Sequence, residues 1–200
     1  MAESAVAKVH SPSQKQVVEK TTGWWAMLAV IATEGALFVY LVFSYAYSAV
    51  QHIGWPPQGP LPLQLSLPNT AVLLSSSLVL VLGLHYLRRG ERDAGHAVTA
   101  IAIALGAMFV GVQLLEWRSV PFTPQSGLYG SLFFTITGFH LAHVVVGLVV
   151  LVAAGAWSLF RVTTQEESVV RLSVGALYWH FVDAVWLVVF FTLYLSPRIG

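Results

Sequence analysis

Residues 177–186 read LYWHFVDAVW, a run in which a histidine and an aspartate stand inside an otherwise apolar segment. An ionisable side chain inside lipid is costly, so such residues face other protein groups or water-filled cavities. His180 and Asp183 are three residues apart, which places them on one face of a helix, where they can satisfy each other. We therefore predict that this segment is a membrane helix packed against protein.

The composition of the whole chain indicates a membrane protein. Of its residues 56% are hydrophobic and only 10% are charged, whereas about a quarter of a soluble domain is charged. The net charge of +1 gives no reason to expect a nucleic-acid partner. The chain contains no cysteine, which excludes disulfides, thiolate metal sites, iron–sulfur clusters and covalent haem attachment.

Outward from the opening stretch, the chain divides into apolar segments of membrane-spanning length. A helix needs about 20 apolar residues to cross the hydrocarbon core. The predicted fold is an all-α integral membrane bundle of five transmembrane helices, preceded by a polar cytoplasmic tail (residues 1–23) and followed by a short external tail (residues 196–200). The predicted spans are residues 24–47, 70–87, 97–115, 131–160 and 173–195.

Lysine and arginine gather on one side of these spans, and cytoplasmic loops carry such an excess. We therefore predict a cytoplasmic N-terminus and an external C-terminus. The residues on the predicted inner side are Lys8, Lys15, Lys20, Arg88, Arg89, Arg92, Arg161 and Arg171, against Arg118 and Arg198 on the outer side.

Ionisable residues near mid-depth in three of the spans are the candidates for a functional site. Glu34 is roughly ten residues into the first span, or about 15 Å at 1.5 Å per residue. If the first, fourth and fifth spans are neighbours, one polar layer can form from Glu34, His140, His143, His180 and Asp183. Glu116 is expected at the outer end of the third span, where water or Arg118 can satisfy it.

Three interpretations of this layer compete. A hydrogen-bonded network that fixes helix packing is the simplest. Proton or ion handling is the second, because a glutamate inside the membrane is a common element of proton relays. Metal or haem ligation is the third, since His140 and His143 share a helix face, but His180 is the one candidate for a facing ligand and Asp183 supplies a simpler partner for it. The residues predict no metal site and no catalytic residue in this chain.

Several motifs, taken in order, resemble subunit III of the haem–copper respiratory oxidases, of the cytochrome c oxidase type. The resemblance runs from about residue 28 to residue 195. It is carried by WPP (residues 55–57), PNTAVLL (68–74), PFT (121–123), GLYGS (127–131), TGFH (137–140) with His143, and YWHFVD (178–183). The chain departs from the family pattern at Leu141-Ala142, between the two histidines.

The resemblance implies a five-helix form of the subunit in a bacterial plasma membrane. In this family the subunit holds no redox centre, and the haems and copper belong to partner subunits of a complex that reduces oxygen to water and pumps protons. Glu34 aligns with the family carboxylate that reacts with a hydrophobic carbodiimide. Subunit I is the expected main contact. Subunit II, subunit IV, a cytochrome c or cytochrome bc complex, and structural phospholipids are further expected partners.

The same resemblance implies support of proton uptake by subunit I at the inner surface, where Glu91, Asp93 and His96 are candidates. Histidine titrates near neutral pH, which suits a relay, although an exposed loop histidine is more often simply solvated. Two alternatives remain open: an accessory subunit of a quinol oxidase or nitric-oxide reductase, and a self-standing proton-coupled transporter using Glu34. Against the transporter, no pair of interrupted helices of the kind such proteins use is evident.

Overall fold

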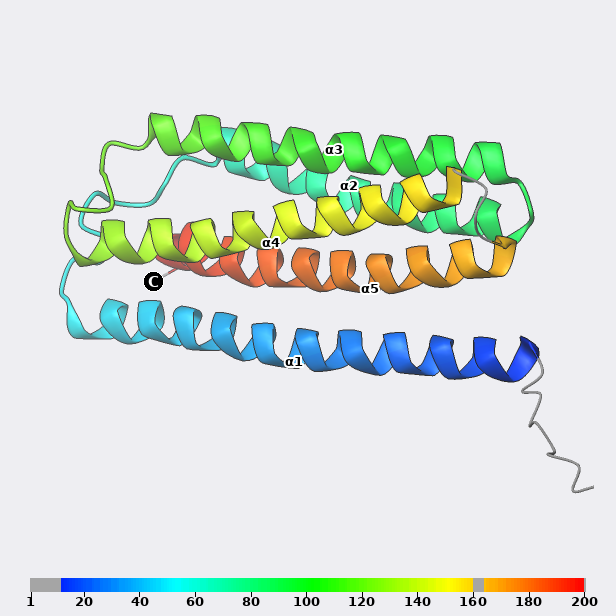
Figure 1. Ribbon diagram of the computed structural model, residues 1–200. Coiled ribbons are helices and arrows are strands. Elements are labelled where there is room, and N and C mark those ends of the chain that lie inside the picture. The colour runs from blue at the N-terminus through cyan, green and yellow to red at the C-terminus, as the bar shows by residue number, and fades with distance from the viewer. Residues whose placement is uncertain (1–11, 160–163, 200) are drawn as a thin grey trace, which may run out of the picture.

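The computed structural model describes residues 12–159 and 164–199, and the elements in them are helical (Figure 1). Five of the helices are long and apolar enough to cross a membrane, which confirms the predicted five-helix membrane fold. They are α1 (Pro12–Gln51), α2 (Leu63–Arg88), α3 (Arg92–Ser119), α4 (Leu128–Leu159) and α5 (Gln165–Phe190). The chain then continues through a π-helical turn (Phe191–Leu195) and a 3₁₀ turn (Ser196–Arg198).

The helices begin earlier than the apolar segments predicted. α1 starts at Pro12, inside the predicted polar tail, of which residues 1–11 lie outside the described residues. Proline suits this first helical position because its missing N–H would have no partner there anyway. α2 starts at Leu63 and contains Pro68, although the prediction began that span at residue 70.

α5 also starts eight residues before its predicted span, and a capping box explains where it begins. The Thr164 side chain accepts from the Glu167 backbone N–H, and the Glu167 side chain accepts from the Thr164 N–H. This reciprocal pair satisfies two backbone donors at the helix end. Residue 160, the predicted end of the fourth span, lies outside the described residues.

Four of the helices form a bundle and the first lies beside it. α2 packs against α3 and α5, and α4 completes the ring by packing against α3 and α5. α1 lies along one side of this bundle, against α4 and α5 (Figure 1). Only 11% of the apolar window of α1 is buried, against 50% for the window that includes α5. α5 is therefore the central helix and α1 the peripheral one.

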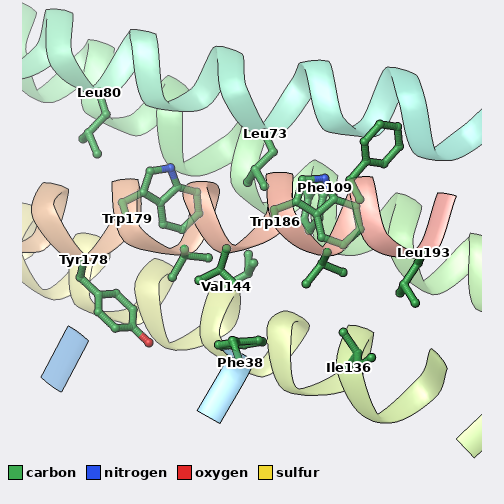
Figure 2. Packing of buried hydrophobic residues seen from close by; sticks show 14 of the residues in the cluster. Phe38, Leu73, Leu80, Phe109, Ile136, Val144, Tyr178, Trp179, Trp186 and Leu193 are labelled. Atoms are coloured by element: carbon green, nitrogen blue, oxygen red, sulfur yellow. The ribbon is translucent and has the colours of Figure 1, made fainter. Parts of the chain in front are cut away.

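The core of the bundle is built around two tryptophans of α5. Trp179 and Trp186 have no exposed surface. Figure 2 shows them projecting from α5 among side chains that include Leu73 and Leu80 of α2 and Phe109 of α3. The LYWHFVDAVW stretch thus supplies the centre of the fold.

α2 and α3 approach each other closely at Gly83. A Cβ atom at this position would lie 2.7 Å from Thr99 Oγ1 and 3.2 Å from the Thr99 backbone nitrogen. Membrane helices commonly use small residues to let backbones come this close. The contact explains why a glycine occurs at this position within α2.

Candidate functional site

Glu34 of α1 and His143 of α4 form an ion pair across the space between the two helices. Glu34 Oε2 lies 3.0 Å from His143 Nε2. The other ring nitrogen, Nδ1, lies 2.6 Å from the Phe139 backbone carbonyl, which can only accept, so Nδ1 carries a hydrogen. Nε2 is the ring nitrogen that faces the Glu34 carboxylate, within hydrogen-bond distance.

This pair lies at the edge of the molecule, not in its core. The Glu34 side chain is 37% exposed and that of His143 is 12% exposed. The pair lines a groove of about 340 Å³ between α1 and α4, which Tyr178 of α5 also lines. The arrangement joins α1 to α4 through a partly exposed pair of ionisable side chains.

We predicted that His180 and Asp183 could pair with each other, but in the structure they do not. Both instead contact Ser77 of α2: the Ser77 hydroxyl donates to Asp183 Oδ2, and Ser77 Oγ lies 3.0 Å from His180 Nδ1. Since the hydroxyl proton goes to the carboxylate, His180 Nδ1–H is the donor in the second bond. Ser77 thus bridges the two residues and joins α5 to α2.

Two more side chains of α5 bond to hydroxyls of α2. Trp179 Nε1 donates to Ser76 Oγ at 3.0 Å, and Trp186 Nε1 donates to Thr70 Oγ1 at 2.9 Å. A row of α2 hydroxyls therefore meets a row of α5 donors and acceptors along the helix contact. The Ser75-Ser76-Ser77 run was the available sequence signal for this contact, but it did not identify Ser77 as the partner of the ionisable pair.

His140 lies apart from both groups. It has no exposed surface, and neither ring nitrogen has a hydrogen-bond partner among the described residues. Its ring centroid lies 4.8 Å from that of Trp186 and 5.9 Å from that of Phe109. The described side chains therefore place the five mid-depth residues in two bonded groups and one isolated histidine rather than in one network.

Glu116 is buried, and its bonded partner among the described side chains is Gln113 rather than the expected Arg118. Only 4% of it is exposed, and Gln113 Nε2 donates to its Oε2 at 3.1 Å. The reason is the length of α3, which continues to Ser119 and so keeps Glu116 within the helix and facing the bundle.

The predicted proton-uptake residues lie at the N-terminal end of α3. Glu91 precedes the helix, Asp93 lies in its first turn and both are exposed, while His96 is half-buried. Next to them, Arg92 Nε donates to Gln165 Oε1, and Gln165 Nε2 donates to the Leu87 carbonyl. These bonds fix the turn between α2 and α3 to the start of α5. Among the side chains that the structure describes, no cluster of three or more His, Cys, Asp or Glu could hold a metal ion.

Replacing Asp183 tests the Ser77 bridge. Asp183→Ala removes the acceptor of the Ser77 hydroxyl and so breaks the bridge between Asp183 and His180 inside the bundle. We therefore expect the free energy of unfolding to fall by about 1–3 kcal/mol. Asp183→Asn keeps an acceptor oxygen and is the matched control, expected close to wild type. Thermal unfolding in detergent measures both, and equal stability of the two variants would contradict the bridge.

The fold and these contacts define a class: a multi-pass helical membrane protein whose mid-depth polar side chains mainly join one helix to another. Comparison with known proteins gives the particular group. The chain belongs to the cytochrome c oxidase subunit III family, whose model, described as "Cytochrome c oxidase subunit III", matches residues 3–197.

Individual relatives agree with this assignment. The chain is 35% identical over 176 residues to "Cytochrome c oxidase subunit 3" of Neurospora crassa, a match that covers 84% of this chain and 65% of that protein. It is 35% identical over 179 residues to the Danio rerio protein of the same name, covering 85% of this chain and 68% of that protein. The chain thus spans about two thirds of the length of these relatives.

Proposed function

We propose that this chain is the non-redox subunit III of a proton-pumping terminal oxidase that reduces oxygen to water, of the cytochrome c type. The observation that carries the proposal is the family match over residues 3–197. The geometry supports a stabilising role, because the Glu34–His143 pair and the Ser77 bridge both join helices. In the complex, the chain would support assembly, stability and proton uptake of the catalytic subunit I, beside subunit II. Subunit IV and a cytochrome c or cytochrome bc complex are further proposed partners.

Purification from the native membrane tests this function. A tagged chain should bring down a haem-bearing subunit in a fixed ratio. An absorption spectrum with haem a and a copper A band would support the cytochrome c type, whereas haem o or haem b alone would support a quinol oxidase. Isolation of the chain without any haem protein would contradict the proposal and favour a self-standing transporter.

We also propose that the N-terminus and the α2–α3 turn face the cytoplasm of a bacterial cell, with the C-terminus outside. The support is the excess of lysine and arginine on that side of the spans. Because the chain contains no cysteine, a single cysteine introduced at Arg89 or at Gln125 reports one side without background. A membrane-impermeant thiol reagent added to intact cells should label the cysteine at position 125 and spare the one at 89.

Glu34→Gln should leave oxygen reduction within about twofold of wild type. The proposed subunit carries no redox centre, so Glu34 contributes little to the transition state of oxygen reduction. The glutamine amide can still donate to His143 Nε2, so the α1–α4 contact is kept. Glu34→Leu removes that bond and is expected to weaken the α1–α4 contact without abolishing turnover. Oxygen uptake by the purified complex measures this, and loss of turnover in fully assembled Glu34→Gln would contradict a non-catalytic chain.

A structural phospholipid is the ligand that we propose for the inner half of the α1–α4 side. A groove of about 430 Å³ lies there, lined by apolar residues such as Val150 and Val174 and by the charged residues Glu166, Glu167 and Arg171. The Arg171 guanidinium lies 5.5 Å from the centre of the Trp157 ring. A groove lined by apolar side chains and by residues of both charge signs suits the acyl chains and the zwitterionic headgroup of a phospholipid.

Arg171→Gln should reduce the phospholipid retained per purified complex, because it removes the cation that would meet the phosphate. Arg118→Gln, an exposed arginine at the other end of the molecule, is the control and should retain the wild-type amount. Quantitative lipid extraction and mass spectrometry measure both, and equal retention in the two variants would overturn the assignment.

A further inference from the structure

Several buried polar atoms without a hydrogen-bond partner among the described residues belong to one end of the bundle, the end that carries the α1–α2 and α3–α4 loops (Figure 1). They are Tyr45 Oη, Trp55 Nε1, Gln113 Oε1, Tyr129 Oη and Tyr194 Oη. We call these residues, together with Glu116, the tyrosine cluster. Buried polar groups in native proteins nearly always have a partner in protein or in ordered water, so a cluster of unpaired ones needs a physical explanation.

The side chains of the tyrosine cluster come from different elements but lie next to one another. The ring of Trp55, in the α1–α2 loop, lies 5.5 Å from that of Tyr45 and 5.3 Å from that of Tyr129, measured between centroids. Tyr45 and Tyr129 are 6.3 Å apart by the same measure. Tyr194 is close enough to Tyr129 for their hydroxyls to interact electrostatically. The unpaired groups therefore form one continuous set.

The π-helical turn after α5 brings this set to α3. Thr192, Leu193 and Tyr194 in the turn are all buried, and π-helical turns of this kind are frequent at functional sites. The Tyr194 hydroxyl lies beside the Gln113 and Glu116 side chains, but no hydrogen bond of ordinary geometry joins it to either of them. The tyrosine cluster thus ends at a buried carboxyl group.

Glu116 needs more hydrogen-bond donors than the described protein groups supply. Gln113 Nε2 donates to its Oε2 at 3.1 Å, and a carboxylate has room for about four such bonds. No lysine, arginine or histidine nitrogen of the described residues lies within 4.0 Å of this carboxyl group. The nearby Arg198 guanidinium instead donates to the backbone carbonyls of Tyr194 and Leu61. Burying a carboxyl group without partners is costly, so further donors are required.

We propose that the tyrosine cluster is a binding site for internal water molecules, which bridge Gln113 Oε1 to the hydroxyls of Tyr129 and Tyr194 and hydrate Glu116. An amide oxygen only accepts, an indole N–H only donates and a tyrosine hydroxyl does both, so one ligand that donates and accepts satisfies all of them. A buried water typically makes about three hydrogen bonds to buried groups that otherwise lack partners. The site is separate from the Glu34–His143 pair and from the Ser77 bridge.

X-ray radiolytic footprinting of the detergent-purified complex tests this site. Brief irradiation converts water into hydroxyl radicals, which oxidise the side chains beside each water molecule. Tyr129 and Tyr194 should be oxidised several-fold faster than Trp179 and Trp186, which are also buried but whose indole N–H groups are bonded to protein. Indole reacts with these radicals at least as readily as phenol does, so intrinsic reactivity predicts the opposite order. Equal protection of all four rings would overturn the proposal.

A substitution in the site gives a second test. Gln113→Leu removes an acceptor from the tyrosine cluster, so the oxidation of Tyr194 should fall several-fold. Thr137→Val is the control, because the buried Thr137 hydroxyl already donates to the Phe133 carbonyl and accepts from Trp117 Nε1. Thermal unfolding shows whether both variants are intact, and unchanged oxidation of Tyr194 in an intact Gln113→Leu protein would refute the water site.

A high-resolution density map of the wild-type complex decides the matter without any variant. Ordered density within about 3 Å of the Tyr194 hydroxyl and of Gln113 Oε1, the length of an ordinary hydrogen bond, would support bound water. Direct bonds among Tyr194, Gln113 and Glu116 with no density between them would refute it.

Discussion

Trp179→Ala should lower the free energy of unfolding by about 3–5 kcal/mol, the cost of removing a large aromatic side chain from a packed core. Trp179 has no exposed surface, and its ring packs directly against the backbones of α3 and α4. A Cβ on Gly106 would lie 2.6 Å from its Cη2, and one on Gly147 would lie 2.9 Å from its Cε3. Because positions 106 and 147 are glycines, no side chain at either position can fill the space that the ring would leave.

Trp179→Phe separates packing from hydrogen bonding. It keeps an aromatic ring but loses the Nε1 donor to Ser76, so we expect a smaller loss, in which the bond itself accounts for about 1 kcal/mol. Trp25→Ala, at a position that is 68% exposed, is the control and should stay near wild type. Unfolding in detergent followed by tryptophan fluorescence or circular dichroism measures the series. A Trp179→Ala protein as stable as Trp25→Ala would refute the central place of this ring.

The second large effect is expected at the α2–α3 contact. Gly83→Leu should cost more than about 2 kcal/mol, because overpacking a tight contact forces backbone shifts. The first added carbon already meets Thr99 Oγ1 at 2.7 Å and the Gly95 carbonyl oxygen at 3.3 Å. Since two of the neighbours are backbone atoms, the helices themselves must move apart to admit the side chain.

Gly111→Leu is the matched control for this prediction. Gly111 also lies within a membrane helix, but a Cβ there would meet nothing within 4 Å. The control variant should therefore unfold like wild type, and recovery of the assembled complex should fall for Gly83→Leu alone. Similar stability of the two leucine variants would mean that α2 and α3 do not meet as closely as the structure has them.

The five-helix fold was predictable because lipid leaves the backbone few choices. Every N–H and C=O in hydrocarbon must be satisfied within the segment, so a long apolar run is almost always a helix. The ends were less predictable, since α5 begins at its Thr164–Glu167 capping box, eight residues before its apolar run. The motifs in the sequence were enough to identify the family, which the comparisons confirm.

The partners of the polar residues could not be predicted from the sequence. In a membrane bundle both the buried and the lipid-facing sides of a helix are apolar, so periodicity does not reveal how each helix is rotated. The sequence placed Glu34 and His143 at similar depth, and the structure joins them. It placed His180 and Asp183 on one face but could not show that Ser77, on another helix, would come between them.

The peripheral position of α1 has a consequence for how the molecule is made. Its neighbours in the fold are α4 and α5, which come later in the chain, whereas α2 and α3 are consecutive and can pair as soon as both are in the membrane. α1 is therefore made before either of the helices that it packs against. Until α4 is inserted with His143, Glu34 lies in the membrane without its partner. The free-energy cost of an unpaired glutamate therefore arises during biosynthesis and not in the finished protein.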